Sequence, residues 1–254
     1  MRDAFAKMKI GITGQSGFIG KRLSQVLSGS AGIVLTPFEK AFFDNEGLLE
    51  GFLSECDLVI HLAFLNRHAN QSFLYDTNLE LARKLAVAWE KSTNPPALLY
   101  ASSIREGEAT AYGQAKRICR EILESAARKK SGRMESLRIP NVFGPGAIPY
   151  NNSFIATFSD QLLTGQTPVI TENREVPLLY IDSLCRYLSV LIGQMEGGHG
   201  ISITEVPSDF RMPVPKVLEV LKGFAREYRK QGTISEQKDP NLENLRRTFL
   251  SYTK

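Results

Sequence analysis

The sequence predicts an α/β protein, a doubly wound parallel sheet followed by a small C-terminal lobe. Two observations lead to this prediction. Short apolar runs alternate along the chain with segments whose apolar residues recur at helical spacing. A glycine-rich turn also joins the first apolar run to the first helical segment, within residues 9–20. Strands that alternate with helices form βαβ units, and these units place parallel strands side by side.

The first element pair is a buried strand at residues 8–12 and a helix at 21–27, joined by the letters G-I-T-G-Q-S-G-F-I-G. Glycine permits a tight turn and a close approach of the backbone to a pyrophosphate, while the helix N-terminus presents its N–H groups to the phosphates. This context predicts a Rossmann-type dinucleotide site. The expected contacts are Gly11, Gly14, Gln15, Ser16, Gly17, Phe18 and Ile19.

Composition excludes several other classes of protein. The 254 residues are 43% hydrophobic and 23% charged, which is typical of a globular domain. A formal charge of +4 without a dense basic run argues against a nucleic-acid partner. The cysteines at 56, 119 and 185 match no disulfide or metal spacing, and no apolar run is long enough to cross a membrane. We therefore expect a cytoplasmic protein with no metal site.

The second strand, predicted at 32–35, bears on the type of dinucleotide. An acidic residue at this strand end usually binds the adenosine ribose of NAD. None stands at the strand tip here, although Glu39 is near. Lys21, Arg22 and Lys40 are candidates to bind a 2′-phosphate, and ordinary surface charge is the alternative for each. The pattern favours NADP(H), with NAD(H) as the alternative.

The third strand, at 57–63, follows a helix at 46–55 and contains His61, for which we expect a packed, neutral role. The loop after it carries Asn66 and Arg67 at the carboxyl edge of the sheet, where open α/β folds bind ligands.

A fourth strand at 97–103 precedes a helix at about 111–128 that carries Tyr112 and Lys116. Their i, i+4 spacing places both on one face. An ammonium beside a phenol lowers the phenol's pKa, which suits a proton donor to a carbonyl that is being reduced. The hydroxyl of Ser103 can bind the same carbonyl oxygen, with Ser102 as the competitor for that role. The three residues together predict an enzyme.

The rest of the chain divides between the core and the lobe. We expect the core at about 8–144 and 176–206, and the substrate lobe at about 145–175 and 207–254. The predicted elements after residue 130 are a strand at 136–139, a helix at 154–162, a loop and strand at 165–170, a returning segment at 174–182, a strand at 201–206 and helices at 214–228 and 242–252.

Four motifs in this order, T-G-x-x-G-F-I-G, D-x-V-x-H-L-A, Y-x-x-x-K and R-x-x-N-V-F-G-P, resemble the extended short-chain dehydrogenase/reductases, or NAD-dependent epimerase/dehydratase family. The resemblance implies that a long helix begins at 77–78 and runs to 91, with Asn78 ordering the active site; a capping role is the alternative. It also implies pairing of two subunits through helices 77–91 and 111–128, with ordinary core as the alternative role for the apolar stripe of the first helix. Further cofactor contacts implied by the family are Leu62, Ala63, Asn78, Tyr112, Lys116, Pro140 and Val142.

Two departures from the family pattern argue against a dehydratase and against the arrangement found in most epimerases. Family dehydratases carry an acidic pair after the active-site residue, whereas Ile104 and Arg105 follow Ser103 here. The interval from Ser103 to Tyr112 is also shorter than in most epimerases of the family.

The segments H-L-A-F-L-N-R, A-Y-G-Q-A-K, L-R-I-P-N-V-F-G and R-E-V-P-L-L-Y-I-D resemble one subfamily, the reductases of UDP-2-acetamido-2,6-dideoxy-hexos-4-ulose in UDP-N-acetyl-L-fucosamine synthesis. The resemblance implies NADPH-dependent reduction of a C4 ketone on a nucleotide sugar. In that subfamily a metal-binding cupin domain usually follows, so this chain is either part of such a protein or a separate reductase with a different 4-keto sugar. The implied substrate contacts are Asn66, Arg67, Asn141, Asn152 and Arg174, the last through the diphosphate.

Two alternatives remain open at this point. An NAD-retaining nucleotide-sugar 4-epimerase would use the same Ser–Tyr–Lys set. A non-catalytic NADP(H)-binding sensor would more typically have lost the Tyr–Lys pair.

Overall fold

The structure is a computed structural model that describes residues 7–151, 153–171, 173–195 and 200–253. It has the expected α/β class, in two compact units. The first unit comprises residues 1–139 and 188–206, and the second comprises 140–187 and 207–254. The sequence placed 140–144 and 176–187 with the core. The structure groups them with the lobe, because the strands within them pair with each other rather than with the large sheet.

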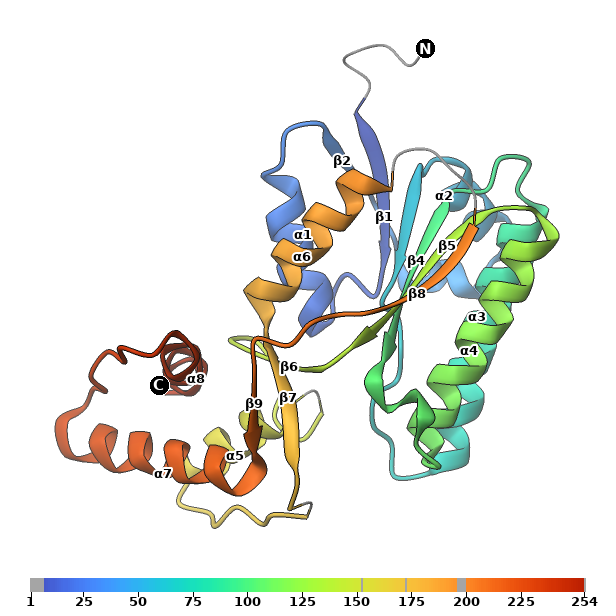
Figure 1. Ribbon diagram of the computed structural model, residues 1–254. Helices are drawn as coiled ribbons and strands as arrows, with labels where there is room; N and C mark the ends of the chain where they lie inside the picture. The colour runs from blue at the N-terminus through green and yellow to red at the C-terminus, as the bar shows by residue number, and fades with distance from the viewer. Residues whose placement is uncertain (1–6, 152, 172, 196–199, 254) are drawn as a thin grey trace. The chain divides into compact units, whose positions relative to one another are not determined.

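The first unit contains a six-stranded parallel sheet in the order β2-β1-β3-β4-β5-β8 (Figure 1). The chain leaves β1 on one side to form β2 and continues on the other side with β3. The switch point therefore lies between β1 and β3, and ligands of such sheets bind at the carboxyl ends there. The strands are β1 Met8–Thr13, β2 Ile33–Thr36, β3 Leu58–His61, β4 Ala97–Ser103, β5 Arg133–Ile139 and β8 Gly200–Glu205.

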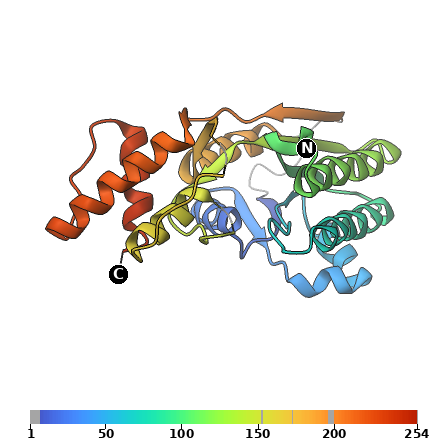
Figure 2. The same ribbon diagram turned by 90° about the horizontal axis from the view of Figure 1, so that it is seen from below.

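Helices cover both faces of this sheet, as the doubly wound prediction requires (Figure 2). Helix α1 (Phe18–Ser28) lies on one face. On the other face α3 (Gln71–Lys91) and α4 (Ala111–Lys129) run side by side, with α2 (Glu46–Ser54) next to α3. Two short 3₁₀ helices, η1 (Lys40–Asp44) and η2 (Ile104–Gly107), follow β2 and β4.

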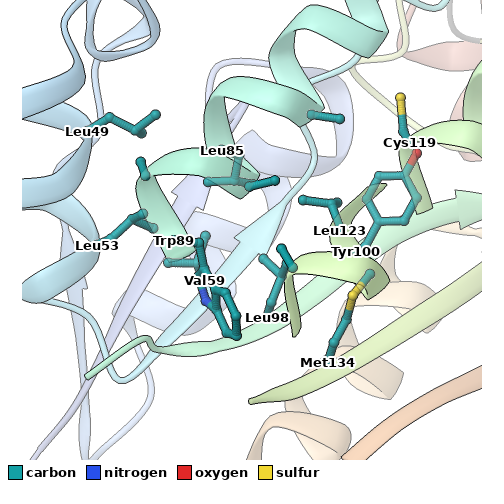
Figure 3. Packing of buried hydrophobic residues seen from close by; sticks show 14 of the residues in the cluster. Leu49, Leu53, Val59, Leu85, Trp89, Leu98, Tyr100, Cys119, Leu123 and Met134 are labelled. Carbon is teal, nitrogen blue, oxygen red and sulfur yellow. The ribbon is translucent and has the colours of Figure 1, made fainter. Parts of the chain in front are cut away.

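The core of the first unit lies between the sheet and the layer formed by α2, α3 and α4 (Figure 3). Leu85 and Trp89 of α3 pack toward Leu98 of β4, and all three are buried. The indole Nε1 of Trp89 donates a hydrogen bond of 2.9 Å to the Pro96 carbonyl, so the one polar atom of this side chain is satisfied. A Cβ at Gly132 would lie 2.1 Å from the Trp89 ring, so this position has no room for a side chain.

The second unit has a smaller sheet in the order β6-β7-β9, with β6 parallel and β9 antiparallel to β7. Its helices α5, α7 and α8 contact one another. The bounds are β6 Asn141–Phe143, β7 Glu175–Tyr180, β9 Phe210–Pro213, α5 Phe154–Leu163, α7 Val214–Gln231 and α8 Pro240–Leu250. Helix α6 (Ile181–Gln194) begins in this unit and ends in the first.

Two expectations about secondary structure were wrong, and three elements were not anticipated. Helix α3 begins at Gln71 rather than at 77, because Asn70 accepts a hydrogen bond from the Phe73 N–H and caps it. Residues 165–170 form a loop without a strand, after a turn at Gly165 where φ is +79°. The sequence also gave no indication of α6, β6 or β9, of which the two strands are only three and four residues long.

Among the described residues, no helix combines the length and apolar character needed to cross a bilayer. In the same part of the chain, no three side chains of His, Cys, Asp or Glu come together as metal ligands.

Candidate active site

The glycine-rich turn at the end of β1 is shaped by its lack of side chains. Gly14 has φ of +76°, and a Cβ there would lie 2.7 Å from the Ala63 nitrogen. At Gly20 a Cβ would lie 2.3 Å from the Gly14 carbonyl, so the first turn of α1 packs directly on the loop. Gly11 differs from these positions. It is buried within β1, where a Cβ would lie 2.3 Å from the Phe52 ring, so its role is to let α2 pack on the strand.

The N-terminus of α1 has no side chain to satisfy its first N–H groups. Its N-cap is Gly17, which makes no side-chain hydrogen bond, and the first turn contains no acidic residue. Phe18 and Ile19 are partly buried there, and Ser16 is exposed. Gln15 turns aside and donates a hydrogen bond of 2.6 Å to the Phe38 carbonyl, which ties the loop to the chain after β2. An uncapped helix N-terminus of this kind is a general feature of anion-binding sites.

His61 has the structural role that its place in a strand predicted. It is buried, and its Nδ1 lies 2.7 Å from the Thr13 hydroxyl. The same hydroxyl also accepts the Ala63 N–H at 3.4 Å. Burial, with the charge of Lys116 as a second cause, lowers the pKa of His61 to about 3. The neutral ring thus holds the end of β1, just before the glycine loop, by its hydrogen bond with Thr13.

Asn78 orders the loop after β3 from the middle of α3. Its Oδ1 accepts the Leu65 N–H at 2.7 Å, and its Nδ2 donates to the Leu65 and Leu74 carbonyls at 3.0 and 2.8 Å. The alternative role as a cap is therefore wrong, since Asn70 is the cap. Leu62, Ala63 and Asn66 in this loop are partly buried, and Arg67 is exposed.

Ser103, Tyr112 and Lys116 come together in the first unit, from the end of β4 and the first turns of α4. The Ser103 hydroxyl accepts the Arg105 N–H at 3.2 Å and hydrogen-bonds Tyr112. The Lys116 Nζ donates to the Ala101 carbonyl at 2.7 Å and lies 5.9 Å from the centre of the Tyr112 ring. A serine hydroxyl has one O–H donor besides the lone pairs that accept the Arg105 N–H, so Ser103 also has a donor beside Tyr112 at the end of β4.

Ser102 faces away from this set. Its hydroxyl donates a hydrogen bond of 2.6 Å to the buried Glu106 carboxylate. Successive side chains of a strand point to opposite faces, so only one of the two serines can accompany Tyr112. The structure places Ser103, and not Ser102, beside Tyr112.

The electrostatics of Tyr112 differ from the prediction. Burial raises the pKa of Tyr112, while the hydrogen bond with Ser103 and the charge of Arg105 oppose that rise. The Arg105 guanidinium carbon lies 5.6 Å from the centre of the phenol ring. Burial also lowers the pKa of Lys116 to about 7, so its charge is partial near neutral pH. Contrary to the prediction, Lys116 is not among the groups that lower the pKa of Tyr112, and the nearby cation that does lower it is Arg105.

Two residues of the set were missed by sequence reasoning. The Phe64 ring lies 3.7 Å from the Lys116 Nζ and packs edge-on against Tyr112 at 5.4 Å between centroids. Arg105 was noted only as a departure from dehydratases. The aromatic residue after H-L-A was a usable signal for Phe64, but the position of Arg105 depends on the path of η2.

The second unit carries the remaining residues predicted to contact the cofactor or the substrate. Asn141 lies in β6, and its Nδ2 donates to the Pro177 carbonyl at 3.1 Å. Pro140 is buried, Val142 is partly buried, and Arg174 is exposed, with its carbonyl bound by the Val214 N–H at the start of α7. Asn152 lies outside the described residues.

The sheet with its glycine turn, and the set formed by a serine of β4 with a tyrosine and a lysine of α4, define an enzyme of the short-chain dehydrogenase/reductase type. Residues 10–203 match the family model described as the NAD dependent epimerase/dehydratase family, and the chain belongs to that family. The predicted fold, family and enzyme class are confirmed.

Individual relatives agree with this assignment. The chain is 30% identical over 248 residues to a UDP-2-acetamido-2,6-beta-L-arabino-hexul-4-ose reductase of Pseudomonas aeruginosa, covering 96% of this chain and 65% of that protein. Among solved structures, it is similar to the capsular polysaccharide assembling protein CapF of Staphylococcus aureus, with a TM-score of 0.75, 26% identity, and coverage of 97% of this chain and 65% of the other. A UDP-glucose 4-epimerase of Thermotoga maritima with UDP-glucose has the same TM-score at 19% identity and covers 96% and 98%. The chain thus spans about two thirds of the length of the first two relatives.

Proposed function

We propose that this chain reduces the C4 ketone of a UDP-linked 4-keto-6-deoxy-hexosamine with NADPH, in the synthesis of a bacterial surface polysaccharide such as O-antigen. The observation that carries the proposal is the joining of Ser103, Tyr112 and Lys116 at the carboxyl edge of the sheet. The 30% identity to a UDP-sugar 4-keto reductase over nearly the whole chain supports the substrate class. A cytoplasmic location accords with the predicted use of NADPH and a nucleotide sugar.

The chemistry assigned to this chain is proton transfer and orientation. A ketone becomes an alcohol when it gains a hydride at carbon and a proton at oxygen, and NADPH supplies the hydride when it is bound. The Tyr112 phenol donates the proton to O4. Ser103 donates a hydrogen bond to the same oxygen and stabilises the charge that develops there. Lys116, anchored on the Ala101 carbonyl, is the proposed partner of the nicotinamide ribose.

The residues proposed to hold the cofactor are those of the glycine turn and the loop after β3. The preference for NADPH rests on the absence of an acidic residue at the end of β2 and on three exposed cations. These are Lys21, Arg22 and Lys40, and Glu39 is exposed beside them. The proposed substrate contacts are Asn66 and Arg67 of the first unit and Asn141, Asn152 and Arg174 of the second.

We also propose that two copies of the chain pair through α3 and α4. The supporting feature is that α3 exposes two large apolar side chains, Phe73 and Val87, at 51% and 47%.

The test of the reduction is to follow NADPH absorbance with a UDP-4-keto-6-deoxy-N-acetylhexosamine. We expect Tyr112→Phe to lower kcat by roughly 10²- to 10⁴-fold, because the proton donor is lost while the ring remains. Tyr75→Phe, a partly buried tyrosine on α3, is the control and keeps the parent rate. Repeating the assay with NADH tests the cofactor preference.

A Tyr112→Phe variant that is as fast as the parent would refute the assignment of the proton donor. If the parent protein oxidises no NADPH and is purified with tightly held NAD, the 4-epimerase becomes the better proposal. The epimerase alternative is supported in fold by the Thermotoga maritima structure.

A further inference from the structure

A buried carboxylate lies directly behind the active site, under the short helix η2. Glu106 is only 4% exposed, and the proton transfer proposed above does not use it. Burying an ionised carboxylate is costly unless it is paired and hydrogen-bonded. The hydrogen-bond partners of Glu106 therefore indicate its role in the structure.

Glu106 joins η2 to three other elements through three donors. Ser102 of β4 donates to its Oε2 at 2.6 Å, and Arg120 of α4 donates to the same oxygen at 3.2 Å. Arg138 of β5 donates to Oε1 at 2.6 Å. Burial alone would raise the pKa of Glu106, but the hydrogen bonds from Ser102 and Arg138 and the charge of Arg120 outweigh it and lower that pKa. The carboxylate is therefore an anion held on both oxygens.

A second buried carboxylate completes the cluster without touching η2. Glu124 accepts a hydrogen bond of 2.8 Å from the Arg120 Nη1 and pairs with Arg128, and all three of these residues lie on α4. Glu124 is buried to 5% exposure, much like Glu106. The two glutamates thus share Arg120 but differ in whether they hold η2, which makes Glu124 a matched control.

Helix η2 determines how Ser103 meets Tyr112. Its Arg105 donates the backbone N–H to the Ser103 hydroxyl and places its guanidinium beside the phenol. The Arg105 carbonyl lies so near the start of α4 that a Cβ on Gly113 would be 2.4 Å from it. A displacement of η2 would therefore move the serine proton, the nearby cation and the helix that carries Tyr112.

We propose that Glu106 is a positioning residue, which holds η2 so that the Ser103 and Tyr112 hydroxyls keep the geometry needed to protonate the substrate oxygen. This inference rests on the proposed function for its effect on rate. The geometry of Ser103 and Tyr112 that it describes can also be measured without turnover.

The experiment compares Glu106→Gln with Glu124→Gln in the full chain. Both changes remove one buried negative charge from the same cluster, so both lower thermal stability. Only Glu106→Gln is expected to lower kcat, by roughly 10- to 100-fold, with KM for the nucleotide sugar nearly unchanged, because small misplacements of reacting groups have effects of this size. Ser102→Ala, which removes one of the three donors, provides a milder variant with an effect in the same direction should Glu106→Gln not fold.

A second measurement does not depend on activity. The chain is labelled with ¹³C at tyrosine Cζ, the Tyr112 signal is assigned by its loss in Tyr112→Phe, and its pH titration is followed. The charged or hydrogen-bonding groups that face Tyr112 are Ser103, Arg105, Glu108 and Lys116. Releasing η2 removes the opposing effects of Ser103 and Arg105, so the pKa of Tyr112 rises further in Glu106→Gln and stays at the parent value in Glu124→Gln.

The inference is overturned if the two glutamine variants have the same kcat and the same Tyr112 titration. It is supported if only Glu106→Gln, or its milder partner Ser102→Ala, changes both. If the parent protein reduces no 4-keto sugar, the proposed function fails, and the titration by itself decides whether Glu106 positions Tyr112.

Discussion

At the scale of single residues, the site combines two cations with different behaviour around one phenol. Lys116 is buried, bound to the Ala101 carbonyl, and has a pKa lowered to about 7. Arg105 is paired with Glu108, whose carboxylate lies 2.8 Å from its Nη2. Of these two cations, only Arg105 lowers the pKa of Tyr112, against the effect of burial. A Tyr-x-x-x-Lys spacing alone does not indicate this contribution from η2.

His61 gives a prediction about stability at low pH. Its pKa is about 3 in the folded chain and about 6.5 when unfolded, so the unfolded state binds more protons between these values. The free energy of unfolding therefore falls as the pH is lowered through this window. Between about pH 7 and about pH 5 the loss from this residue is roughly 2 kcal/mol.

Urea denaturation at these two pH values checks the prediction. His61→Asn keeps an acceptor for the Thr13 hydroxyl but does not titrate, and it should lose less stability than the parent on acidification. His68→Asn, at an exposed site, should behave like the parent. If the free energy of unfolding depends on pH equally in the parent and in His61→Asn, the burial of a neutral His61 is not the cause of the loss of stability at low pH.

At the scale of elements, the junction between η2 and α4 is the most constrained part of the site. Thr110 caps α4 by accepting the Gly113 N–H at 3.1 Å. A Cβ on Gly113 would meet the Arg105 and Glu108 carbonyls at 2.4 and 2.7 Å. Gly113, the glycine of A-Y-G-Q-A-K, is thus required by the close approach of two backbones. From the sequence alone it appears only as a residue of low helix propensity within a helix.

Gly113→Ala should lower both stability and kcat. The clash is with backbone atoms, which cannot rotate away, so we expect a loss of roughly 1–3 kcal/mol in the free energy of unfolding. The matched control is Gly51→Ala in α2, where a Cβ meets nothing within 4 Å. There the helix should gain up to about 1 kcal/mol.

Chemical denaturation and steady-state kinetics of these two variants give the answer. Stabilisation by alanine at both glycines would mean that η2 does not press on α4. If Gly113→Ala lowers stability but leaves kcat unchanged, the packing of this junction does not determine the position of Tyr112.

At the scale of the whole molecule, the proposed pairing through α3 and α4 predicts a dimer in solution. Sedimentation should then give twice the 28.3 kDa of one chain. Val87→Arg on α3 should shift the protein to a monomer, because it places a charge in the proposed apolar contact. Val190→Arg on α6, at another exposed valine, should leave the dimer intact. A monomeric parent, or an unaffected Val87→Arg, would refute this interface.

Much of the first unit was predictable because its signals are local. A buried parallel strand is a short apolar run, a helix repeats its apolar residues every three to four positions, and the glycine turn joins the two. The six strands of the parallel sheet, the glycine loop and the Tyr112–Lys116 spacing follow from such patterns. The short strands β6 and β9 and the start of α3 do not, since each depends on partners or a cap that a periodicity does not show.

The sequence by itself determined the fold class, the family and the spacing of Tyr112 and Lys116, because these depend on residue type and spacing within single elements. Only the tertiary structure decided which serine faces Tyr112, which cation sets its field, and why Asn78 lies in the middle of α3. Each of these depends on contacts between residues from different elements, such as the hydrogen bonds of Ser102, Arg120 and Arg138 to Glu106. Such contacts exist only after the chain has folded and brought β4, β5, η2 and α4 together.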